Sequence, residues 1–92
     1  MPEVFRFFGF VFFFYSREHD PLHIHVEGKG GSAKYDYDDQ SNRFVRNYAK
    51  GITSADMKRI EEVINDNVDI IVAAWNRHFG LDEQDSEDML FW

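Results

Sequence analysis

The chain has 92 residues, ten of them phenylalanine and none of them cysteine, and a formal net charge of −7. This length supports one domain, and folding should bury about 60–65% of the surface of the unfolded chain. The lack of cysteine excludes disulfides, thiolate zinc sites and a cysteine nucleophile, and it suits a cytoplasmic protein. We expect no signal peptide, and the apolar run at residues 5–15 is too short to span a membrane.

The negative charge is concentrated toward the end of the sequence. Residues 82–88 contain five acids and no base, whereas residues 1–81 contain twelve acids and ten bases. A nearly neutral body argues against nucleic-acid binding, which requires a clustered basic surface. One loose basic group remains, either a phosphate-contact patch or a solvated face. It consists of Arg43, Arg46 and Lys50.

Alternating apolar residues and turn signals predict an antiparallel sheet. Strands are expected at residues 4–8, 10–15, 22–28 and 32–37, and residues 44–48 form either a fifth strand or an irregular segment. The second strand is apolar on both faces, because Phe10, Phe12 and Phe14 alternate with Val11, Phe13 and Tyr15. Either other parts of this chain cover both faces, or one face meets a second copy or another protein.

One long helix is predicted over residues 54–79, with Thr53 and Asp56 resembling a capping box. Apolar residues recur at spacings of three and four and form a stripe for packing on the sheet. They are Met57, Ile60, Ile64, Val68, Ile71, Trp75 and Phe79. The expected fold class is α+β, with four to five antiparallel strands, the helix on one face, and Trp75 and Phe79 near the aromatic strand.

Residues 1–80 form the predicted domain, and residues 81–92 form an acidic tail with an apolar end. Apolar side chains are costly to leave in water, so we expect this end to fold back or to dock on a neighbouring copy. Disorder of residues 82–88 is the alternative. The residues predicted to serve interaction are Phe13, Tyr15, Leu90, Phe91 and Trp92.

Three histidines, His19, His23 and His25, lie within seven residues. His23 and His25 should project from one face of a strand, and the turn at residues 20–21 would bring His19 beside them. Three imidazoles would suit a transition metal such as zinc or nickel. Nearby groups that would support such a site are Glu18, Asp20, Glu27 and His78. The alternatives are a structural or partner-contact role and histidine-dependent cleavage of RNA, and no catalytic residue can be assigned.

Two stretches, "FRFFGFVFFFYSREHDPLHIHVEG" and "AAWNRHFG", resemble a small bacterial domain family of unknown function. The resemblance covers about residues 1–80 and rests on a pattern that ends in E-H-x-P-x-H-(I/V)-H-V, followed by a helix end with A-W-N-x-x-F-G. The matching positions are His19, Pro21, His23, His25, Val26, Trp75 and Asn76.

The family resemblance implies a bacterial cytoplasmic protein that is encoded beside another small protein, in a toxin–antitoxin-like or regulatory pair. It brings no established activity. The leading hypothesis is therefore a protein-interaction module that binds this small partner, another copy of itself, or both. The alternatives are a metal- or histidine-dependent RNA-cleaving toxin that uses His19, His23 and His25, and a nucleic-acid-binding regulator.

Overall fold

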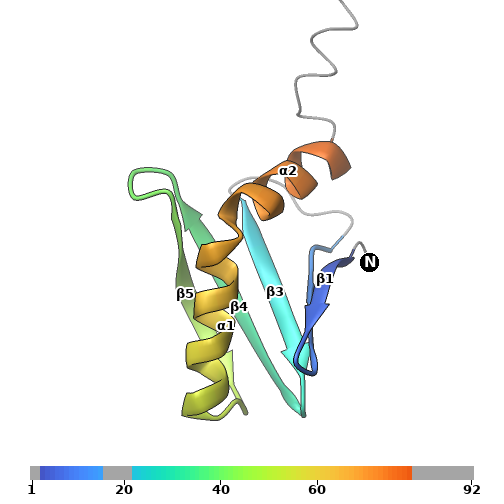
Figure 1. Cartoon of the computed structure of the whole chain (residues 1–92), viewed down its shortest axis with the longest axis vertical. Coiled ribbons are helices and arrows are strands. Elements are labelled where there is room, and N and C mark those ends of the chain that lie inside the picture. Colours follow the sequence, from blue (N-terminus) through green and yellow to red (C-terminus); the bar gives the residue numbers. More distant parts are fainter. Residues whose placement is uncertain (1–2, 16–21, 80–92) are drawn as a thin grey trace, which may run out of the picture.

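A computed structural model of the chain describes residues 3–15 and 22–79 and has an α+β architecture (Figure 1). The strands are β1 (Glu3–Phe7), β2 (Phe10–Phe13), β3 (His23–Gly28), β4 (Gly31–Asp38) and β5 (Arg43–Lys50). They form one antiparallel sheet in the order β1-β2-β3-β4-β5, so each strand pairs with its neighbours in sequence. The predicted fold class is confirmed, and the segment left open in the sequence forms the fifth strand.

Two tight hairpins shape one end of the sheet. Phe8 and Gly9 turn β1 into β2, and Lys29 and Gly30 turn β3 into β4, all four with positive φ. Paired positive φ values match the twist that two-residue hairpins need. The hairpins also approach each other closely, because a Cβ atom on Gly28 would lie 2.2 Å from the carbonyl oxygen of Gly9.

The predicted single helix is interrupted at Asn67. The two helices that result are α1 (Ser54–Asp66) and α2 (Val68–His78). The side-chain amide of Asn67 donates to the carbonyl oxygen of Val63 at 2.7 Å, an acceptor that a continuous helix would pair with the Asn67 backbone N–H. That N–H donates instead to the carbonyl of Ile64 at 3.1 Å. The start of α1 agrees with the prediction, since Thr53 Oγ1 accepts from the backbone N–H of Asp56 at 3.2 Å.

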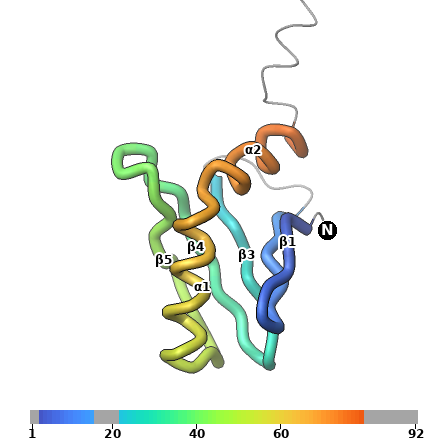
Figure 2. The backbone as a smooth tube through the Cα atoms, in the orientation of Figure 1, coloured from blue at the N-terminus to red at the C-terminus, as the bar shows by residue number. Residues whose placement is uncertain are grey.

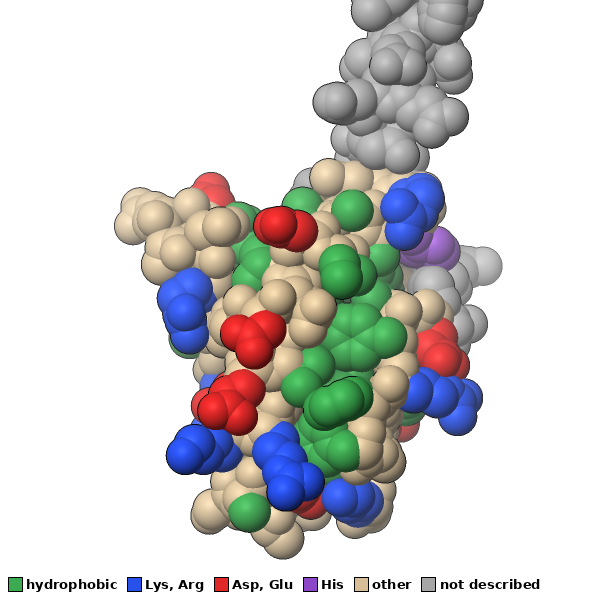
Figure 3. Space-filling model, viewed as in Figure 1, with side chains coloured by type: hydrophobic (Ala, Val, Ile, Leu, Met, Phe, Trp, Pro, Cys, Tyr) green, Lys and Arg blue, Asp and Glu red, His purple; other side chains and the backbone are tan. Residues whose placement is uncertain are grey.

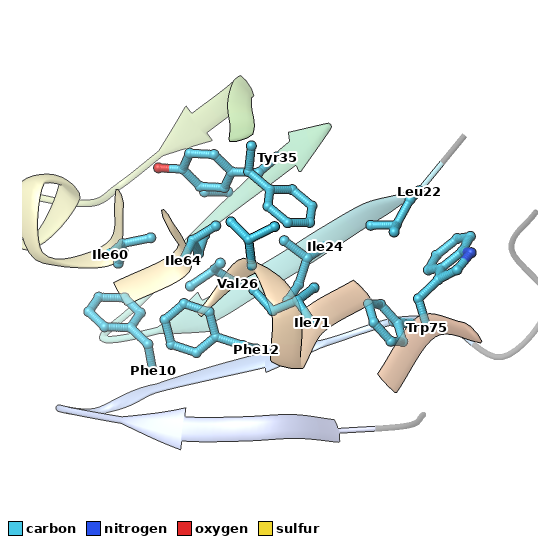
Figure 4. Packing of buried hydrophobic residues seen from close by; sticks show 14 of the residues in the cluster. Phe10, Phe12, Leu22, Ile24, Val26, Tyr35, Ile60, Ile64, Ile71 and Trp75 are labelled. Carbon is cyan, nitrogen blue, oxygen red and sulfur yellow. The ribbon is translucent and has the colours of Figure 1, made fainter. Parts of the chain in front are cut away.

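The core lies between the sheet and the two helices, which cover one face (Figures 1 and 2). Figure 4 shows side chains from β2, β3 and β4 meeting those from α1 and α2. The expected contact between Trp75 and the aromatic strand is confirmed, because the Trp75 ring lies 5.1 Å from that of Phe14. Phe79 also approaches Phe14, with 6.4 Å between ring centroids.

Two side chains of α1, those of Asn65 and Glu61, make polar contacts with β4 and the edge strand β5. The side-chain oxygen of Asn65 accepts from the backbone N–H of Phe44 at 2.9 Å, and its amide donates to the Phe44 carbonyl at 3.4 Å. Further along, Glu61 accepts from the Tyr35 hydroxyl at 2.8 Å and from Arg46 Nε at 2.7 Å. Burial, followed by this hydrogen bond to Glu61, raises the pKa of Tyr35 well above its usual value.

The length and apolarity of the helices in the described part of the chain fall short of what a membrane crossing requires.

Candidate functional site

The face of the sheet opposite the apolar core carries His23, His25 and Glu27 of the predicted site, and we call it the open face. Strand register arranges its side chains in rows that run across β2 to β5. One row contains Phe13, His25, Lys34 and Tyr48. The next row contains His23, Asp36 and Val45. The open face therefore carries an aromatic and histidine half on β2 and β3, a charged centre on β4 and an apolar pair on β5.

The histidine half is a packed cluster of rings. His23 and His25 share a face of β3, as predicted, with ring centroids 5.4 Å apart. The His25 ring stacks on Phe13 at 5.4 Å and meets the edge of Tyr15 at 4.5 Å. Both histidines are buried, with exposed fractions of 8% and 9%, while Tyr15 remains 45% exposed. The cluster thus presents one amphipathic tyrosine to solvent and holds its two imidazoles beneath the surface.

The cluster connects to α2 through Trp75. The ring centroids of His23 and Trp75 lie 5.5 Å apart, so α2 contacts the first residue of β3. Trp75 is only 1% exposed, and within residues 3–15 and 22–79 its Nε1–H finds no hydrogen-bond acceptor. A buried donor without an acceptor is uncommon in proteins, because its desolvation is uncompensated. In Figure 4 this nitrogen points away from the apolar core.

The centre of the open face is held by one polar contact within β4 and one between β4 and β5. Lys34 Nζ lies 4.0 Å from Asp36 Oδ1, and the other Asp36 oxygen accepts from the Asn47 side-chain amide at 2.7 Å. Asp36 lies opposite His23 in the ladder, but these contacts engage both of its oxygens. The charged strip therefore separates the histidine cluster from Val45 and Tyr48.

The metal-site prediction is only partly addressed by the described residues. His19, Glu18 and Asp20 lie outside them, and among those that are described no three metal-binding side chains come together. His23 and His25 supply two imidazoles, whereas protein zinc sites use three or four protein ligands. Glu27 follows His25 on the open face but is exposed beside Val11 and Ser32. His78 packs on Phe79 at the end of α2, 4.5 Å between ring centroids.

The predicted phosphate-contact group is spread along β5. Arg43 and Lys50 begin and end this strand, which places them about 23 Å apart at 3.3 Å per residue. Arg46 points to the helix side and forms an ion pair with Glu61, with Nη2 and Oε2 2.5 Å apart. The three bases therefore share a strand without forming a cluster.

The interaction residues predicted from the sequence divide into two groups. Phe13 is fully buried, so Tyr15 is the member of that pair that offers surface. Leu90, Phe91 and Trp92 lie outside the described residues. The structure adds Val45 and Tyr48, which are 53% and 45% exposed on the open face. Their shared face has no simple sequence signal, because residues three apart in a regular strand point to opposite faces. A bulge in the β4–β5 ladder, at Asn47, brings them to the same side.

Comparison with protein families provides a match over residues 9–76, from the β1–β2 turn to the second half of α2. The matching family is a domain of unknown function, DUF4160. The chain belongs to the DUF4160 family. The match includes the histidine strand and Trp75, whereas β1 and residues 80–92 lie outside it. No curated protein and no solved structure shows significant similarity to the chain.

Proposed function

We propose that this DUF4160 protein is a protein-interaction module that binds its partner through the open face. The observation that carries the proposal is the one-sided fold. The helices pack on the core side of the sheet, with Trp75 of α2 also reaching His23. On the other face Tyr15, Val45 and Tyr48 are about half exposed, while Phe13, His23 and His25 are buried. Tyrosine is enriched in protein interfaces, because it buries a large rigid ring and keeps a hydroxyl for hydrogen bonding.

The chemistry of the open face indicates the kind of partner. Apolar contact is available at both sides of the face, and the Lys34–Asp36 strip between them offers one charge of each sign. A small protein surface with a complementary ion pair between two apolar patches fits this pattern better than a nucleic acid, because phosphates need concentrated positive charge. We propose a small protein encoded by the neighbouring gene of a bacterial toxin–antitoxin-like or regulatory pair, with both proteins in the cytoplasm.

The test compares Val45→Lys with Ile70→Lys in a pull-down of the neighbour-encoded protein. Val45 and Ile70 are 53% and 54% exposed, the first on the open face and the second on α2, so the two changes differ mainly in location. Val45→Lys also places its ammonium opposite Asp36, which adds a favourable cross-strand pair and limits the loss of stability. We expect Val45→Lys to weaken binding at least about tenfold and Ile70→Lys to leave it unchanged. Equal binding by both variants would remove the open face as the interface.

One geometric feature favours a second candidate, a histidine-dependent RNA-cleaving toxin. His23 and His25 lie with their ring centroids 5.4 Å apart, close enough for one acid and one base to act on the same substrate if the rings, only 8% and 9% exposed, become accessible to it. Growth arrest on induced expression that is lost in a still-folded double variant His23→Ala, His25→Ala would favour this alternative. Stoichiometric zinc or nickel in native mass spectra would indicate the metal-dependent form. Harmless expression, absence of metal and capture of the small neighbouring protein would support the interaction module.

A further inference from the structure

A second surface lies on the helix side, between β1 and α1. It is a hollow of about 420 Å³ that we call the β1–α1 groove, lined by Phe5, Arg6, Phe7, Val63, Asp66 and Asn67. Figure 3 shows continuous hydrophobic surface along it. The groove exists because neither helix covers the β1–β2 hairpin: α1 packs toward β5, and α2 turns across the end of the sheet (Figures 1 and 2).

The apolar wall of the groove is incompletely covered. Phe5 packs on Phe12 with ring centroids 4.7 Å apart, so the floor continues directly from the core. Phe7 is 51% exposed, which is a large exposed fraction for a phenylalanine beside a hollow. Contiguous exposed apolar surface of this kind marks docking sites in soluble proteins.

We propose that the β1–α1 groove binds the apolar end of the same chain, residues Met89–Trp92. The path of the chain supports this occupant. The last turn of α2 lies beside the start of β1, since Arg77 and His78 line a common hollow with Glu3 and Val4. The nine residues 80–88 can span up to about 30 Å when extended. Strand β1 has five residues and is about 17 Å long. The segment can therefore reach any part of the groove.

The charge of the residues that connect α2 to the tail also supports the tail as the occupant of the groove. The connecting residues 82–88 contain five acids and no base. Along the way, Arg77 lies in the last turn of α2, beside the start of β1. In the described part of the chain Arg77 forms no ion pair and can attract the acidic connector, whereas Asp66 in the groove lining favours the apolar end there over the connector. An acidic segment is attracted to such an arginine over about 10 Å at moderate salt.

The tail and part of the groove lining both lie outside the family match. Phe5 and Phe7 on β1 and residues 80–92 all lie outside the range that the DUF4160 family model matches. The proposed groove contact therefore rests partly on residues outside the family match, whereas the open face is built from residues within it. The inference is independent of the proposed function and concerns the opposite side of the sheet.

Disulfide trapping tests the proposal directly, because the chain has no native cysteine. The test variant combines Val63→Cys in the groove with Leu90→Cys in the tail. The matched control combines Val45→Cys, on the open face, with the same Leu90→Cys. On mild oxidation, we expect a monomeric cross-linked product to form at least about tenfold faster in the test variant than in the control.

A third variant adds Phe7→Ser to the test pair. Phe7 lies outside the buried cluster, so this change removes groove surface without opening the core. We expect it to lower the cross-linking rate to that of the control. Equal rates for test and control would overturn the proposal, as would a rate that Phe7→Ser leaves unchanged. Cross-linked dimers in place of monomers would assign the groove to the tail of a second copy and would overturn the intramolecular contact.

Discussion

Replacing Tyr35 with phenylalanine tests the network that joins the sheet to α1. The change removes the hydroxyl that donates to Glu61 at 2.8 Å and keeps the ring, which is 1% exposed. Glu61 keeps its ion pair with Arg46, so no buried carboxylate is left unpaired. A hydrogen bond to a charged group contributes about 1.5–3 kcal/mol, and the partial exposure of Glu61 reduces this. We expect Tyr35→Phe to lower the free energy of unfolding by about 1–1.5 kcal/mol, measured by urea denaturation near neutral pH.

The same variant has a defined pH dependence. The pKa of Tyr35 is raised in the folded protein, first by burial and then by the hydrogen bond to Glu61. Above about pH 10 an unfolded tyrosine loses its proton while the folded one keeps it. The stability that the hydroxyl contributes is therefore complete below about pH 10 and is lost as the pH rises further. The difference in the free energy of unfolding between wild type and Tyr35→Phe should therefore become smaller above about pH 10. A difference near zero at neutral pH, or one that stays constant up to about pH 11, would refute this account.

Three further substitutions, at Asn65 and Trp75, examine the packing that supports the open face. Asn65→Ala removes both hydrogen bonds to the Phe44 backbone and should cost about 1–3 kcal/mol in urea unfolding; a loss below about 0.5 kcal/mol would show that α1 does not hold this edge. Trp75→Ala should cost about 3–5 kcal/mol, because it opens a cavity beside Phe14 and His23. Trp75→Phe should cost clearly less, since it also removes the buried Nε1–H that lacks an acceptor in residues 3–15 and 22–79. Equal losses for the two Trp75 variants would contradict that explanation.

Local patterns in the sequence predicted most of the fold. The helical stripe is correct at every position from Met57 to Trp75, because those side chains are buried in the core. The break at Asn67 could not be read from the stripe, since α1 and α2 both keep its phase and bury the same series of residues. The break depends on a side-chain amide that competes with the backbone for one carbonyl, and asparagine does this only in some helices.

The sequence predicted which side chains of the candidate site share a face within one strand, but not which side chains of neighbouring strands lie beside them. The common face of His23 and His25 follows from the two-residue period of β3. Their neighbours Lys34 and Asp36 follow only from the register of the β3–β4 hairpin. Val45 and Tyr48 depend further on the bulge between β4 and β5, which reverses the facing that alternation predicts. The apolar half of the open face was therefore missed, although each of its residues was visible in the sequence.

The interruption at Asn67 also solves a problem of size. An unbroken helix over residues 54–78 would be about 37 Å long at 1.5 Å per residue. The longest strands of the sheet have eight residues and reach about 26 Å, whereas the 13 residues of α1 reach about 20 Å and fit over them. A straight rod would overhang the sheet by roughly 10 Å and leave its last apolar turns without a neighbour. Because the chain bends at Asn67, the residues that would overhang form α2 and cover the end of the two-layer fold. Trp75 is therefore buried without a third layer of secondary structure.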